Sequence, residues 1–169
     1  DQLLRWDEGA EVTPLTCARE IREGVFSFYS WDRKSLGFPP AWQTNAYTSE
    51  VVPSSEHWSR LADFGFGDIK HVWELSRFGW VYPLVRAYAR DGDRAHAETF
   101  ELLLEDWMEK NPPNLGPQWK CGQEVAIRLM AVLWGSFGLP VNSEIRESVR
   151  RLAWVSGKRI AANIEYALQ

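Results

Sequence analysis

The sequence has few cysteines, and they form no motif in which they could act together. Cys17 and Cys121 lie far apart in the chain, with no CxxC spacing and no histidine pair beside them. Zinc sites and disulfide frameworks need cysteines that are clustered or repeated. The sequence therefore predicts neither, and it predicts no bound metal or cofactor.

Long apolar runs, basic clusters and the common catalytic motifs are also absent. No apolar run approaches the roughly 20 residues of a membrane-spanning helix. The basic residues are scattered and the formal net charge is −4, whereas a nucleic-acid surface needs clustered Lys and Arg. Neither a glycine-rich phosphate loop nor GxSxG occurs. We therefore expect no membrane span and no nucleic-acid partner.

Tryptophan is abundant, with ten copies among 169 residues. A chain of this length suits one domain with a real core. Indole rings serve either as large wedges in such a core or as platforms on which sugar rings stack. Composition alone leaves both roles open.

Residues 1–67 are predicted to form an irregular, aromatic leader packed on the rest of the chain. Pro39, Pro40 and Pro53 stand among polar residues and disfavour long helices there. The run VFSFY at 25–29 fits one strand or an extended packed segment.

From Asp68 onward, apolar residues recur with the period of a helix, which predicts a helical portion over residues 68–169. The expected helices are 68–90, kinked or split into two pieces at Pro83, 93–111, 118–137, and a fourth from Asn142 or Ser143 with no stop signal before Gln169. Gly92 suits the left-handed position after the first helix. Short connections make antiparallel hairpins, so the predicted class is all-α: a bundle, a solenoid or an (α/α) toroid.

Two charged pairs interrupt the apolar faces of these helices. Glu124 and Arg128 are four residues apart in a helix that is apolar on most sides. Such charges either form an internal ion pair or line a ligand cleft, because an isolated buried ion is very costly. Glu74 and Arg77 form a similar pair beside Trp73, which is either a salt bridge among core indoles or part of a groove for an acidic sugar.

Trp119 stands at the start of the third predicted helix, with Gln123 one turn later. A tryptophan at the mouth of a helix can face a cleft, so Trp119 is the best candidate for a stacking platform.

Several motifs occur together in a specific order. They are DIK, WELSR, AYARDGD, the W-x-x-x-NPP turn that begins at Trp107, and W-x-x-x-x-E-x-x-x-R from Trp119 to Arg128. GFPPAW and then HW precede them. In this order and spacing, residues 24–169 resemble the N-terminal helical domain of the heparinase II/III-like polysaccharide lyases, a group that includes alginate lyases.

The resemblance implies an incomplete (α/α) toroid whose helical hairpins surround a cleft for an anionic polysaccharide, such as a glycosaminoglycan or alginate. In the family a β-sandwich domain follows, and the enzymes cleave uronate-containing chains by β-elimination. Their catalytic groups are an asparagine with a neighbouring histidine, a tyrosine and a further histidine. None can be placed here, since Asn163 is not followed by histidine. The substrate-binding residues that we expect on the cleft wall are Trp73, Arg77, Trp119, Gln123, Glu124 and Arg128.

The hypothesis from sequence is therefore the N-terminal part of a polysaccharide lyase, inactive alone and completed by a C-terminal remainder. The alternative is a non-catalytic carbohydrate-binding module or a helical scaffold. An acidic polysaccharide substrate favours a periplasmic or secreted protein. A ring that is cut partway exposes its inner helix faces, so self-association is also expected.

Overall fold

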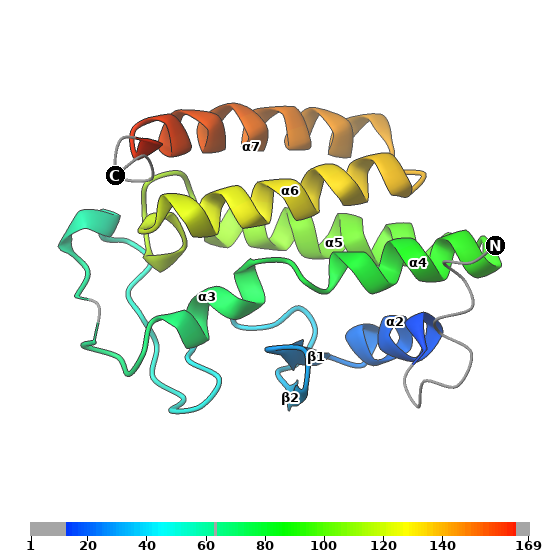
Figure 1. Cartoon of the computed structure of the whole chain (residues 1–169), viewed down its shortest axis with the longest axis horizontal. Coiled ribbons are helices and arrows are strands. Elements are labelled where there is room, and N and C mark those ends of the chain that lie inside the picture. The colour runs from blue at the N-terminus through cyan, green and yellow to red at the C-terminus, as the bar shows by residue number, and fades with distance from the viewer. Residues whose placement is uncertain (1–12, 63, 165–169) are drawn as a thin grey trace.

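The computed structural model describes residues 13–62 and 64–164, which are mostly helical (Figure 1). In chain order the elements are α2 (Pro14–Arg22), β1 (Val25–Phe28), β2 (Asp32–Ser35), the short 3-10 helix η1 (Trp58–Arg60), α3 (Lys70–Ser76), α4 (Val81–Asp91), α5 (Ala95–Lys110), the 3-10 helix η2 (Pro117–Trp119), α6 (Gly122–Gly138) and α7 (Ser143–Ala161).

The four long helices form two antiparallel hairpins, α4/α5 and α6/α7, because short turns join the members of each pair (Figure 1). Helices α4 and α6 run side by side in the same direction. Gly135 lies against Val81, and Gly138 lies against Val85 one turn further along both helices. A Cβ at Gly138 would be only 2.5 Å from the Val85 side chain, so the close approach of these helices requires glycine.

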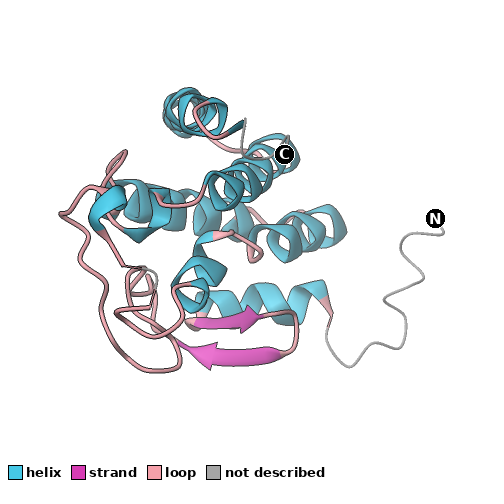
Figure 2. Cartoon of the chain, turned by 60° about the vertical axis from the view of Figure 1, so that its left-hand side comes forward, coloured by secondary structure: helices cyan, strands magenta, loops and turns pink. Residues whose placement is uncertain are grey.

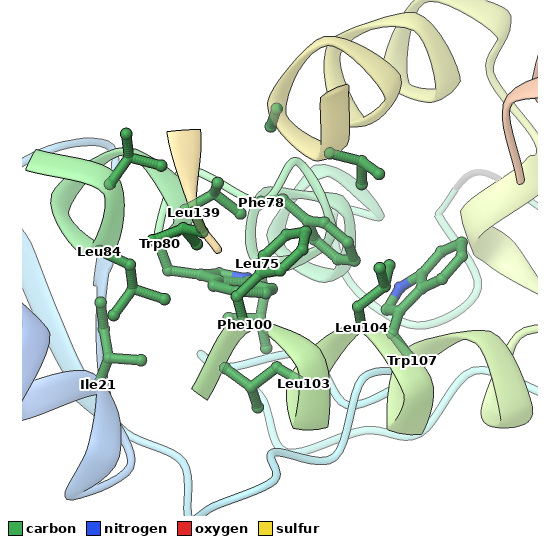
Figure 3. Close-up of a cluster of buried hydrophobic side chains, with 14 of the residues drawn as sticks. Ile21, Leu75, Phe78, Trp80, Leu84, Phe100, Leu103, Leu104, Trp107 and Leu139 are labelled. Atoms are coloured by element: carbon green, nitrogen blue, oxygen red, sulfur yellow. The ribbon is translucent and has the colours of Figure 1, made fainter. Parts of the chain in front are cut away.

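The core lies between the α4/α6 pair and helix α5, and it is built largely from aromatic wedges (Figure 3). Trp80 and Phe100 pack against each other with ring centroids 6.3 Å apart, and the Phe78 and Trp107 rings meet edge to face at 5.4 Å. Trp80 and Trp107 therefore act as wedges in the core, which is one of the two roles that composition left open.

Residues before α3 add a helix and a small sheet to one side of α4 (Figure 2). Strands β1 and β2 pair antiparallel, from Val25 opposite Ser35 to Phe28 opposite Asp32. Phe26 and Phe28 point inward and are 1% exposed. The turn of this hairpin contains Tyr29 with a positive φ of 51°, a left-handed conformation that non-glycine residues adopt at a cost.

The prediction of a mostly helical chain is confirmed, and the structure adds a small two-stranded sheet that the expected all-α class does not include. The one strand allowed at 25–29 is present, and its partner β2 was not expected. The predicted leader is also less irregular than expected, since α2 lies within it. Its start is readable in sequence: Thr13 Oγ1 accepts the backbone N–H of Thr16, and Pro14 occupies the first helical position. Residues 1–12 lie outside the described part.

The predicted helix over 68–90 is split into two helices, which was one of the two alternatives, but the split does not occur at Pro83. The chain breaks between α3 and α4 at Phe78, whose φ is 61°. Pro83 sits in the first turn of α4, where a missing backbone N–H breaks no helical hydrogen bond. The left-handed Gly92 at the end of α4 is confirmed, with a φ of 69°.

The last predicted helix begins as expected and ends early. Asn142 caps α7 by accepting the backbone N–H of Ile145 at 2.9 Å. The helix ends at Ala161. The expectation of a helix that continues without a stop is therefore wrong within the described residues, which extend to residue 164. Residues 165–169 lie outside the described part. Among the described helices, none has the length and apolar character needed to cross a lipid bilayer.

Candidate functional site

A partly buried ionic cluster joins α3 to the first turn of α6. Arg77 donates from Nε to Glu124 Oε2 at 2.6 Å and from Nη2 to Glu124 Oε1 at 2.7 Å. Its Nη1 donates to Glu74 on the preceding turn. We call Glu74, Arg77 and Glu124 the acidic cluster, because two carboxylates share one guanidinium and leave one negative charge in excess.

The geometry keeps Arg77 charged, and it links the acidic cluster to the strained turn of the β1/β2 hairpin. Hydrogen bonds to Glu124 raise the pKa of Arg77 well above its ordinary value, against the opposing effect of burial. Glu74 Oε1 also accepts the backbone N–H of Tyr29 at 3.0 Å, which helps to hold the left-handed turn in place. Burial and the nearby Glu74 charge both raise the pKa of the Tyr29 phenol, so it stays protonated at neutral pH.

The predicted pair of Glu74 with Arg77 is thus confirmed, whereas the predicted pair of Glu124 with Arg128 is wrong. Glu124 turns to Arg77 on the neighbouring helix. Arg128 donates to two backbone carbonyls instead, Gln118 O at 2.7 Å and Ser76 O at 3.2 Å. The loops around η2 and the end of α3 supply these acceptors, and spacing within one helix cannot reveal them.

Arg128 is a charged residue sealed in the core, 1% exposed. Its guanidinium lies 4.4 Å from the centre of the Trp107 ring and 5.6 Å from that of Trp119, so the indole faces stabilise the cation. Burial lowers the pKa of Arg128 to about 9, which still leaves the group charged at neutral pH. Arg128 therefore holds backbone segments together and does not reach a ligand.

Trp119 does not offer a stacking face, and that prediction is wrong. Its side chain is 1% exposed, and its Nε1 donates to the carbonyl of Asn111 at 3.1 Å. The residue belongs to η2, which turns the indole inward against Trp107. Trp73 is half-buried, and its Nε1 donates to the carbonyl of Pro117 at 2.8 Å, so it anchors the same loop.

The exposed side of α6 carries a stripe of large apolar side chains. Met130 is 59% exposed, Trp134 55% and Phe137 85%, and the exposed Gln123 lies at the start of the same face. We call these four residues the α6 stripe. Their spacing of three, four and seven residues places them on one side of a helix. From sequence we expected α6 to be covered on nearly all sides, and this stripe corrects that expectation.

Tyr82 links the α6 stripe to a pocket that Glu74 of the acidic cluster lines. Tyr82 of α4 is 41% exposed, and its ring centroid lies 6.4 Å from that of Trp134. Tyr82 and Glu74 both line a pocket of about 360 Å³ between α2, the hairpin and α4, which Arg33 and Arg86 also line. A continuous surface therefore runs from exposed aromatic rings into a pocket with charges of both signs. Aromatic rings beside polar groups are the composition of many small-molecule sites.

The sequence missed Tyr82, Trp134 and Phe137 as surface residues, because an apolar helical pattern does not say which of its faces has a neighbour. Of the expected site residues, Arg77 and Glu124 meet in the cluster, Gln123 is exposed beside it, and the other three anchor the core. Within residues 13–62 and 64–164, no three His, Cys, Asp or Glu side chains gather as a metal site would require. Comparisons of this chain with protein-family models, with curated proteins and with solved structures found no match.

Proposed function

We propose that this chain is the N-terminal helical part of a polysaccharide lyase that cleaves uronate-containing anionic glycans by β-elimination. In this proposal the chain forms a wall of the substrate cleft and is inactive alone, and the remainder of the protein supplies the catalytic groups. The proposal rests on the order of motifs described above and on the surface that joins the α6 stripe to the pocket beside Glu74.

The arrangement of the hairpins supports the toroid part of the proposal. Because α4 and α6 run parallel and each is followed by an antiparallel partner, α5 and α7 also run parallel to each other. Two such hairpins repeated side by side make one layer of α4 and α6 and a second layer of α5 and α7. Further hairpins added in the same sense would continue the arc, with the α6 stripe on its first layer.

The observation that carries the proposal is the exposed pair of Tyr82 and Trp134. Exposed indole and phenol rings stack on the apolar faces of sugars while their polar edges remain hydrated. Gln123 adds an amide that can donate to and accept from sugar hydroxyls. These residues take the role that we first expected for Trp119.

The acidic cluster acts indirectly in this site. The guanidinium of Arg77 is fully engaged by two carboxylates, so it does not neutralise a uronate carboxylate. It fixes α3 and the hairpin turn against α6 and thereby shapes the pocket beside Glu74. A carboxylate of the glycan would compete with Glu20 for Arg33, which lines the same pocket.

Binding tests the role of Trp134 directly. We expect the chain to bind uronate oligosaccharides of the alginate and heparan types, and Trp134→Ala to weaken binding about fivefold to tenfold, since an aromatic contact contributes about 1 kcal/mol. Isothermal titration calorimetry measures both. Trp154→Ala is the matched control, because Trp154 is 67% exposed on the opposite layer and should leave affinity unchanged. Equal affinities for all three proteins, or no binding, would overturn the assignment.

Catalysis is tested with the whole protein. A full-length protein mixed with a uronate polymer should generate unsaturated uronate, seen as new ultraviolet absorbance, and the present chain should generate none. Absorbance produced by the present chain would contradict the statement that it is inactive alone. Failure of a folded, glycan-binding full-length protein to produce any would contradict elimination.

One observation favours the alternative of a helical scaffold. Met130 and Phe137 are exposed apolar side chains, and such side chains suit packing against another helix. If the scaffold is correct, oligosaccharides will not change the fluorescence of Trp134 at any concentration.

A further inference from the structure

The outer layer carries a groove between α5 and α7 that is independent of the proposed glycan surface. It has a volume of about 830 Å³, and its floor is apolar, with Met108 and Leu152 among the lining residues. Trp154 stands on its α7 wall, 67% exposed, with Lys158 Nζ 4.7 Å above the ring. An exposed indole of this size beside an apolar groove is characteristic of interaction surfaces.

The two walls of this groove carry opposite charges. Glu105 and Glu109 line it from α5, whereas Arg150 and Arg151, together with the single carboxylate Glu147, line it from α7 and leave that wall with a net positive charge. Within residues 13–62 and 64–164 no ion pair crosses the groove. Arg150 instead pairs with Glu147 of its own helix at 3.1 Å, in a strongly exposed contact, and Arg151 donates to Ser148 Oγ. Each wall therefore presents its charge outward.

We propose that this groove is a dimer interface for a second copy of this chain, related by a two-fold axis that runs along the groove. Such an axis exchanges the two walls. The α7 wall of one copy, with Arg150 and Arg151, then faces the α5 wall of its partner, with Glu105 and Glu109.

Helix direction selects this axis over the alternative. Since α5 and α7 run parallel, a rotation about the groove keeps every residue at its own level along the helices. The four charged residues line the same pocket, so they meet at the right height. A two-fold axis across the groove would place α5 on α5 and set carboxylates against carboxylates, which is unfavourable.

The interface is self-complementary, as a two-fold contact must be, and every contact between the acidic and basic walls occurs twice. Trp154 of each copy would pack on the α5 wall of the other, which Met108 also lines. The ionic contacts are at the rim and partly solvated, so they set orientation and salt dependence, while the indole and the groove floor supply the buried apolar area.

Exchanging the charges of the α5 and α7 walls tests the interface, because a variant that had only lost its fold would not dimerise again when it is mixed with the opposite variant. We expect wild-type chain to dimerise in analytical ultracentrifugation, with the dissociation constant rising as salt is added, because 1 M salt screens charges beyond about 3 Å. Arg150→Glu with Arg151→Glu should raise that constant at least tenfold. Glu105→Arg with Glu109→Arg should do the same.

Mixing the two double variants should restore a dimer, because the acidic groove of one then meets the predominantly basic groove of the other. A chain with all four substitutions should also dimerise. Arg22→Glu with Arg90→Glu is the matched control, since both arginines are exposed on other helices and the change in charge is identical. Circular dichroism confirms that each variant keeps its helices.

Three results would overturn the proposal. They are a wild-type chain that stays monomeric up to high protein concentration, charge variants that dimerise like wild type, and a mixture of the two variants that stays monomeric. A dimer that is lost in Trp134→Ala but kept in the charge variants would place self-association on the α6 stripe instead.

Discussion

The two sides of helix α6 reverse the usual relation between polarity and burial. On the inner side, the charged residues Glu124 and Arg128 are 6% and 1% exposed. On the outer side, the apolar residues Trp134 and Phe137 are 55% and 85% exposed. Both arrangements occur within one helix of 17 residues.

The difference teaches that the burial of each side of α6 is decided by the elements packed against it and not by the hydropathy of its own residues. The buried charges are tolerated because every one meets an acceptor, a donor or an indole face, and an unmatched buried ion would be very costly. The exposed apolar side chains remain outside because no described element covers them. The inner side therefore stabilises the fold, and the outer side is available to bind.

The largest expected effect comes from truncating Arg128, the cation on the inner side of α6. Arg128→Ala should lower the free energy of unfolding by about 3 to 5 kcal/mol, because it leaves a cavity between Trp107 and Trp119 and two carbonyls without a donor. Met130→Ala, on the outer side half a turn away, should change it by less than about 0.5 kcal/mol. Urea denaturation measures both, and comparable losses in the two variants would show that the sides do not differ.

A smaller loss in the free energy of unfolding tests the role of the acidic cluster. Glu124→Gln keeps the size of the side chain but removes a charged, bidentate acceptor from Arg77, and should cost about 1 to 3 kcal/mol. Glu23→Gln is the matched control, because Glu23 pairs with Arg19 on the surface of α2 at 4.0 Å and should cost less than about 0.5 kcal/mol. A loss no larger than in the control, again by urea denaturation, would mean that Arg77 needs only Glu74.

The smallest expected effect concerns a polar pair on the surface, Tyr47 and Asp32. Partial burial and the hydrogen bond from Tyr47 Oη to Asp32 Oδ2, 2.8 Å long, raise the pKa of Tyr47 to about 12. Because the folded pKa lies above the ordinary value of about 10, this stabilisation is complete below pH 10 and is lost as pH rises through about 12.

Tyr47→Phe should therefore flatten the decline of stability between pH 10 and pH 12, with the same helical content at pH 8. Denaturation midpoints at pH 8 and pH 11 give the difference. An unchanged pH dependence in the variant would show that the phenol does not contribute, and an absorbance titration of tyrosinate would then place its pKa near 10.

The comparison also explains which predictions from the sequence succeeded. Glu74 and Arg77 are three residues apart near the end of α3, so their pairing needs only local geometry and was predicted correctly. Glu124 and Arg128 have equally good spacing, yet Glu124 binds Arg77 of another helix. The competing partner lies 47 positions away in the chain. No spacing within α6 indicates it.

Trp119 and Trp134 show the same limit for aromatic residues. Their sequence contexts made Trp119 the better candidate for an exposed platform, because it precedes the helix whereas Trp134 lies within its apolar pattern. The short η2 helix turns Trp119 into the core, and Trp134 falls on the side of α6 that no described element covers. The tryptophan content predicted that both roles were available, but it could not assign them.

The sequence by itself determined the long helices from α5 onward, the approximate limits at Gly92 and Asn142, and the antiparallel pairing, because caps, turns and apolar periods act over a few residues. Only the tertiary structure decided that Phe78 rather than Pro83 divides the first helix, that Arg128 serves backbone carbonyls, and that Tyr82 meets Trp134. Each of these depends on which element packs beside which, and that is settled by contacts between residues that are distant in the chain.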